Sequence, residues 1–313
     1  MRQVHAAGEE DSHAFGEFMQ EPLPRPRAAR FSDHLVRGNR FRVARWRAET
    51  GRPARPLLFF SGIGANIELL APFLEQLRGR DVVTLDILGL GGSSESLKPY
   101  RLSAMAEAAA QIVAELGYDE IDVMGVSWGG MLAQEFAYRH RGMVKRLILA
   151  ATSPGMPMIP GNLGSLIKMV LPHRYVAMGA IETFLQGLYG GSSQGLGDYA
   201  SRIRPPTPQG YLHQLLAIVG WTSVRKLTRV SAETLILMGE DDRLVPPANG
   251  HILKFLLKHA RLEVLANAGH LFVLTHKDEA AEMIERFLDG APAAALTPRR
   301  AERPARLAAG SAA

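Results

Sequence analysis

The amino-acid sequence predicts an α/β fold on a mostly parallel β-sheet, and three features of the chain lead to that prediction. Short apolar runs recur, and most are followed by a segment whose apolar residues repeat at helical spacing. Glycine-rich breaks follow several of these runs, as is typical of turns from a strand into a helix. The alternation stops over residues 154–228, where only helical patterns and turns occur, and then resumes. We therefore expect helices on both faces of the sheet and an inserted helical block.

The composition excludes several kinds of site. The chain has 313 residues and a hydrophobic content of 47%, enough for one large domain with an insertion or for two small ones. It has no cysteine, which excludes disulfides, thiolate metal sites and a cysteine nucleophile. No apolar run is long enough to span a bilayer, and the first twenty residues lack the apolar core of a signal peptide. A cytoplasmic protein is the expectation.

Both ends of the chain are expected to lie outside the folded part. Residues 1–30 are polar, with a proline-rich extended stretch at 22–26, and predict a flexible leader. Residues 291–313 carry four arginines and one glutamate, so this tail holds +3 of the net charge of +5. Since it has no aromatic residue and no recognition motif, we expect a disordered basic tail and no nucleic-acid partner.

The expected core consists of residues 31–153 and 229–290. Its first half begins with an alternating stretch at 41–46, which predicts an antiparallel strand at the sheet edge. Continuous apolar runs then predict strands that are covered on both faces. These strands are expected at 56–60, 82–86, 121–126 and 147–151, with helices at 67–78, at 102–116 and directly behind residue 126. The second half has two further strands, at 234–238 and 262–265, and a last helix at 278–288.

Residues 154–228 are expected to form a helical cap. Helical patterns occur at 163–171, 176–189, 198–203 and 211–227. An insertion after the strand at 147–151 lies at the carboxyl edge of the sheet, where such sheets bind ligands. The cap is therefore predicted to cover an active site.

The stretch Gly125-Val126-Ser127-Trp128-Gly129 joins an apolar strand directly to a helical pattern. This G-x-S-x-G turn is the sequence form of a nucleophile elbow, in which a strained backbone presents the serine hydroxyl at the top of the sheet. The pentapeptide alone also occurs by chance, but the strand before it and the helix after it favour a nucleophile at Ser127.

A serine nucleophile needs a base and an acid, and both are expected on later loops, acid first. The strand at 234–238 leads into an acidic turn, from which Asp242 is the preferred acid and Asp241 the alternative. Acidic turns are common on protein surfaces, so this turn alone would not indicate a site. His270 follows the next strand, and of the ten histidines it is the one on a loop just beyond a late strand. We expect His270 to be the base.

The oxyanion of an acyl-transfer reaction needs two backbone N–H donors. One is expected from Trp128, directly after the nucleophile, and the other from Ile63 in the glycine-rich loop 61–64. A glycine turn with no catalytic role could have the same residues at 61–64. The joint order of all five features along the chain indicates a serine hydrolase.

Six stretches, including Phe60-Ser-Gly-Ile-Gly-Ala-Asn-Ile-Glu-Leu-Leu70, Gly125-Val-Ser-Trp-Gly-Gly130 and Gly220-Trp-Thr-Ser223, resemble the intracellular medium-chain-length poly(3-hydroxyalkanoate) depolymerases. The others are Pro172-His-Arg-Tyr-Val176, Leu188-Tyr-Gly-Gly191 and Gly269-His-Leu-Phe272. These enzymes are α/β-hydrolases. The resemblance covers roughly residues 41–288 and departs at Arg243, where many hydrolases carry proline.

The resemblance implies a serine hydrolase that cuts the ester bonds of stored polyester granules, with Ser127, Asp242 and His270 as its triad. It implies neither a metal nor an organic cofactor. The expected partner is a polyester granule or a 3-hydroxyacyl ester, at the granule surface, and the oligomeric state stays open. Apolar residues over 156–189 suit an aliphatic side chain.

Two other functions fit the same sequence. A small-molecule carboxylesterase or lipase would share fold and triad, because these do not fix the substrate. A non-catalytic granule-binding protein would share the scaffold only. A haloalkane dehalogenase is disfavoured, since it would need an acid at position 127.

Overall fold

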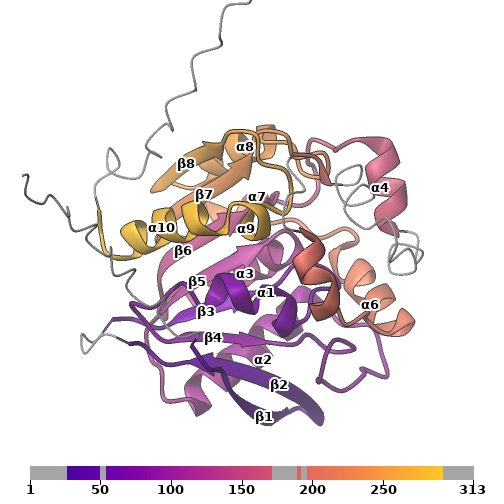
Figure 1. Ribbon diagram of the computed structural model, residues 1–313, viewed down its shortest axis with the longest axis vertical. Helices are drawn as coiled ribbons and strands as arrows, with labels where there is room; N and C mark the ends of the chain where they lie inside the picture. The colour runs from indigo at the N-terminus through magenta and orange to yellow at the C-terminus, as the bar shows by residue number, and fades with distance from the viewer. Residues whose placement is uncertain (1–26, 50–53, 171–188, 192–195, 292–313) are drawn as a thin grey trace, which may run out of the picture.

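The structure is a computed structural model that describes residues 27–49, 54–170, 189–191 and 196–291. Most of the predicted leader and of the basic tail therefore lies outside the described residues. The described part contains an eight-stranded sheet in the order β1-β2-β4-β3-β5-β6-β7-β8 (Figure 1). The strands are β1 Arg30–Val36, β2 Asn39–Trp46, β3 Leu57–Phe60, β4 Val82–Leu85, β5 Ile121–Val126, β6 Val144–Ala150, β7 Glu233–Gly239 and β8 Ala260–Leu265.

Strands β3 to β8 are parallel, and β2 joins them antiparallel through β4. The α/β fold with a mostly parallel sheet is thereby confirmed. The prediction that residues 41–46 form the sheet edge is wrong, because β1 pairs outside β2. Most side chains of β1 are exposed, and its sequence accordingly contains no apolar run. A polar hairpin strand of this kind gives no hydrophobic signal in the sequence.

The described fold begins before the predicted boundary at residue 30. Arg27 is buried, and its guanidinium donates to the backbone carbonyls of Leu77 and Arg80. These bonds fasten the chain to the segment that follows α1 (Ile67–Leu74). Helix α1 is shorter than predicted, because the turns after Leu74 are closed by hydrogen bonds between residues three apart, such as Leu77 N to Leu74 O.

Helices cover both faces of the sheet, as predicted. One buried apolar cluster joins one sheet face to α2, α3 and α8, and a second joins the other face to α1, α9 and α10. Neighbouring residues of β5 divide between them, with Val123 in the first cluster and Met124 in the second. The bounds are α2 Leu102–Glu115, α3 Trp128–Arg139, α8 Ala248–Leu256, α9 Phe272–Thr275 and α10 Lys277–Leu288. In the part of the chain that the structure describes, no helix is both long and apolar enough to span a bilayer.

Between β6 and β7 the described residues form helices and turns, apart from one isolated bridge between Gly155 and Thr222. Helices α4 and α6 lie at the right of the molecule in Figure 1. The predicted helix at 176–189 lies outside the described residues except for Tyr189. The elements are α4 Leu163–Val170, the 3₁₀ helix η3 Leu196–Arg202, α6 Pro208–Ile218 and α7 Val224–Leu227.

The prediction of one helix over residues 211–227 is wrong, because α6 ends at Ile218 and α7 begins at Val224. Gly220 between them has a φ of 67°, a left-handed conformation that interrupts a right-handed helix. The apolar pattern continued across this break because residues on both sides are buried, among them Ala217 and Leu227.

Candidate active site

Ser127 occupies the sharp turn between β5 and α3. Its φ of 55° and ψ of −119° lie outside the regions that non-glycine residues ordinarily adopt. Hydrogen bonds hold the turn on both sides: Ser127 N donates to Ala150 O at 2.9 Å, and Thr152 Oγ1 donates to Ser127 O at 2.7 Å. The strain is therefore fixed by the surrounding structure, as is typical of functional sites.

Glycines on each side of Ser127 allow the close approach of strand and helix. A Cβ atom on Gly125 would lie 2.1 Å from Gly129 O, and one on Gly129 would lie 2.2 Å from Phe60 O. Any side chain at these positions would push α3 away from β3 and β5. The G-x-S-x-G spacing is thus a packing requirement of this turn.

The side chains of Ser127, His270 and Asp242 form one hydrogen-bonded row. Ser127 Oγ lies 2.9 Å from His270 Nε2, and Asp242 Oδ2 lies 2.7 Å from His270 Nδ1. Because a carboxylate only accepts, we assign the imidazole proton to Nδ1, which leaves the Nε2 lone pair facing the serine hydroxyl. His270 is 4% exposed and Asp242 5%.

The three predicted triad residues are therefore brought together by loops after β5, β7 and β8. The second carboxylate oxygen of Asp242 accepts from the backbone N–H groups of Leu244 and Val245, both at 2.8 Å. These two bonds orient the carboxylate towards His270. Asp241, the alternative acid, is exposed, and its backbone N–H donates to Ala268 O.

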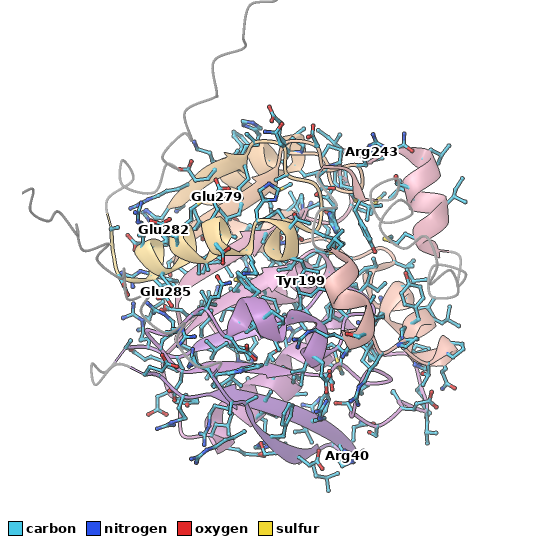
Figure 2. All side chains as sticks on the ribbon, in the orientation of Figure 1. Arg40, Tyr199, Arg243, Glu279, Glu282 and Glu285 are labelled. Carbon is cyan, nitrogen blue, oxygen red and sulfur yellow. The ribbon has the colours of Figure 1, made fainter. Side chains whose placement is uncertain are left out.

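Tyr189 covers His270 from the side of the inserted region. The two rings are stacked, with centroids 5.7 Å apart and planes 9° apart. Tyr189 O also accepts from His270 N at 3.0 Å and from Arg243 N at 3.4 Å. Arg243 lies near α4 in Figure 2. A proline in its place would lack the N–H that reaches Tyr189 O, which gives this departure from many hydrolases a structural reason.

The loop after β3 lies directly beside Ser127. A Cβ atom on Gly62 would be 3.6 Å from Ser127 Cβ. The loop is a tight turn, since Ala65 N donates to Gly62 O at 3.2 Å and Gly64 has a φ of 71°. Ile63 thus sits at the tip of a glycine turn next to the serine, and Trp128 is the first residue of α3. Both predicted oxyanion donors flank Ser127.

Two residues that contact the site, Tyr189 and Gln214, could not be identified from the sequence. Tyr189 falls inside the Leu-Tyr-Gly-Gly stretch, but nothing in that stretch predicts a ring stacked on His270. Gln214 of α6 is fully buried and contacts both Trp128 and Gly64. Within the described residues, no group of histidines and acids is arranged to hold a metal ion.

Comparison with known proteins gives the same fold. The family model described as alpha/beta hydrolase fold matches residues 55–277. A poly(3-hydroxyalkanoate) depolymerase of Ectopseudomonas oleovorans is 39% identical over 244 residues, which cover 76% of this chain and 86% of that protein. A pimeloyl-[acyl-carrier protein] methyl ester esterase of Neisseria meningitidis is 29% identical, over 73% of this chain and 91% of that protein.

Among solved structures, the enol-lactonase from Burkholderia xenovorans superposes with a TM-score of 0.70. The sequences are 19% identical, and the superposition covers 82% of this chain and all of that one. At this identity the likeness shows the fold alone. The family model and the depolymerase relative are the matches that bear on function.

Proposed function

Because the chain belongs to the α/β-hydrolase family and is a hydrolase, we propose that it cleaves ester bonds of intracellular medium-chain-length poly(3-hydroxyalkanoate) through an acyl-enzyme on Ser127. The hydrogen-bonded row of Ser127, His270 and Asp242 carries the proposal. The 39% identity with a poly(3-hydroxyalkanoate) depolymerase supports the substrate class. The described geometry needs no metal for this chemistry.

His270 Nε2 takes the proton of Ser127 Oγ as that oxygen attacks the ester carbonyl carbon. The carbonyl oxygen gains negative charge, which the N–H groups of Trp128 and Ile63 stabilise. The imidazolium then gives its proton to the leaving alkoxide, the 3-hydroxyl end of one polymer fragment. Water repeats the same steps on the acyl-enzyme and releases the acid end of the other fragment. Asp242 stabilises the imidazolium in both halves of the cycle.

The inserted region, residues 154–228, is proposed to be the cap that meets the polymer. It carries several exposed large apolar side chains, and exposed apolar surface of this kind is typical of sites that bind an apolar partner. These are Met156, Ile159, Leu163, Ile167, Leu212, Leu216 and Val219, between 40% and 72% exposed. Such a surface suits the aliphatic side chains of a polyester, because each buried methylene contributes up to about 0.8 kcal/mol. The enzyme would then act at the granule surface.

The proposal is tested by incubating the purified protein with polyester granules of differing side-chain length and measuring the 3-hydroxy acids and oligomers released. We expect release from medium-chain-length granules and none from the Ser127→Ala variant, whose fold is checked by circular dichroism. Hydrolysis of soluble p-nitrophenyl esters without release from any granule would contradict the polymer substrate. It would favour a small-molecule esterase instead.

A further inference from the structure

The loop that carries Ile63 is held by the inserted region at two points. At one end of the turn, Gly64 N donates to Gln214 Oε1 at 2.9 Å. At the other, Asn66 Nδ2 donates to Arg202 O at 3.2 Å, and Arg204 N donates to Asn66 Oδ1 at 3.2 Å. The turn beside Ser127 therefore takes part of its support from residues outside the sheet.

Helix α6 is itself fixed tightly to the core, which gives Gln214 a defined position. Gly210 packs so closely on Gly89 that a Cβ atom on Gly89 would lie 2.4 Å from Gly210 Cα. Thr207 N donates to Gly89 O at 3.1 Å, and Thr207 Oγ1 accepts from Gly210 N at 3.0 Å. Gln214 lies four residues after Gly210 and thus on the same face of the helix.

Gln214 contacts Gly64, the residue after Ile63, and also Trp128. Its side-chain oxygen holds the peptide between Ile63 and Gly64, and its backbone oxygen accepts from Trp128 Nε1 at 2.8 Å. The residue is fully buried, so water does not replace these bonds. The peptide that it holds follows Ile63 directly, and rotation of that peptide would change the direction of the whole turn.

We propose that Gln214 is a positioning residue for the oxyanion hole: its side-chain amide fixes the Ile63–Gly64 peptide and thereby aims the Ile63 N–H at the developing oxyanion. This inference rests on the proposed ester hydrolysis. Catalytic donors must be pre-aligned to stabilise charge, so a turn that loses its acceptor stabilises the transition state less while the substrate binds as before.

The test compares Gln214→Met with Gln134→Met. Methionine keeps the length of the side chain and removes the acceptor. Gln134 is a matched control because it is also fully buried and links α3 to neighbouring segments: its Nε2 donates to Gly130 O of α3 and to Ser153 O after β6, and its Oε1 accepts from Ser223 Oγ of the inserted region. None of these hydrogen bonds involves a residue of the turn at Ile63. Gln214→Asn, which keeps the amide but shortens it by one methylene, is the second variant.

Two quantities are measured for each variant: kcat and KM for a soluble p-nitrophenyl ester, and the inhibition constant of an alkyl trifluoromethyl ketone. The ketone forms a tetrahedral oxyanion adduct with a serine, so its affinity reports on the oxyanion hole. Removing a whole oxyanion donor costs about a hundred- to a thousand-fold, so misaligning one is expected to cost about tenfold. Thermal unfolding of each variant reports on the fold.

We expect both Gln214 variants to lower kcat about tenfold, to leave KM unchanged and to weaken the ketone by the same factor. Gln134→Met is expected to lower only the unfolding temperature. A folded Gln214→Met or Gln214→Asn protein with wild-type kcat and ketone affinity overturns the inference, and so does a rise in KM alone. A wild-type protein that neither hydrolyses esters nor binds the ketone overturns the proposed function, which is a different result from failure of the Gln214 variants.

Discussion

Asp242 and Asp241 are adjacent acids with opposite surroundings, which makes them a natural pair for comparison. The Asp242 carboxylate is buried between His270 and two backbone N–H groups, whereas Asp241 is exposed. The loop turns sharply after β7, so the side chain of Asp242 faces His270 and that of Asp241 faces the solvent. The proposed difference in role between the two acids therefore follows from the path of the backbone.

We predict that Asp242→Asn lowers kcat far more than Asp241→Asn. An amide at position 242 can donate to His270 Nδ1 and so favour the tautomer that cannot accept the serine proton. In other Ser-His-Asp enzymes this change costs about ten-thousandfold in kcat. Steady-state hydrolysis of a p-nitrophenyl ester measures both variants. A larger loss in Asp241→Asn would move the acid to residue 241.

The ring of Tyr189 lies parallel to the imidazole of His270. Stacked on His270, it is expected to favour the imidazolium that forms as the serine attacks. Aromatic stacking and cation–π contacts contribute about 0.5–2 kcal/mol, so Tyr189→Leu should lower kcat about two- to thirtyfold. Tyr189→Phe keeps the ring and should keep most of the activity. If the leucine and phenylalanine variants have the same kcat, the stack does not assist catalysis.

At the scale of elements, the strand and turn that carry Ser127 follow closely from the sequence, and the supports of the site do not. β5 is fully buried and, apart from Asp122, has no polar side chain, so its bounds coincide with those predicted. The apolar pattern does not indicate β1, because this strand is polar. It does not indicate the break between α6 and α7 either, because buried residues continue on both sides of Gly220. Gln214 and Gly64 are 150 positions apart, and no local pattern predicts a bond over that distance.

The contact of α3 with α7 predicts a pH dependence. Burial alone would raise the pKa of Glu135, but hydrogen bonds from Lys226, Trp221 and Arg139 outweigh it and lower that pKa below its ordinary value of 4.5. A lowered pKa in the folded state stabilises the fold above the ordinary value, and this stabilisation is lost as the pH falls through the folded-state pKa.

Glu135→Gln is accordingly expected to lower the free energy of unfolding by about 1–3 kcal/mol at pH 7, because Lys226 loses its charged partner. The difference from the wild type should shrink as the pH falls below about 4.5. Denaturant unfolding of both proteins across the pH range measures it. A difference that stays constant from pH 7 to pH 3 would show that the ionisation of Glu135 does not stabilise this contact.

In the molecule as a whole, the sheet carries the proposed triad, and the inserted region both supports the turn at Ile63 and presents an exposed apolar surface. Leu163 and Ile167 lie four residues apart on α4 and are 72% and 52% exposed. Phe255 on α8 is 88% exposed but belongs to the core domain. A glutamate placed on α4 and a glutamate placed on α8 should therefore differ in their effect on binding to the granule.

We predict that Ile167→Glu lowers binding to medium-chain-length granules and release of 3-hydroxy acids, because a charged side chain must be desolvated against the polymer. The same variant should hydrolyse a soluble p-nitrophenyl ester at the wild-type rate. Phe255→Glu should behave as the wild type in both assays. Equal granule binding by both variants and the wild type would mean that α4 does not meet the polymer.

Whether Ser127 is a nucleophile that His270 activates can be measured by labelling the native protein with a fluorophosphonate and locating the adduct by peptide mass spectrometry. We expect one stoichiometric adduct on Ser127, with loss of ester hydrolysis in proportion to labelling, and no adduct in Ser127→Ala. His270→Ala should slow the labelling strongly, because the serine then lacks its base. Full activity of a protein labelled at Ser127, or an intact Ser127 in a protein that the reagent has inactivated, would mean that Ser127 is not the nucleophile.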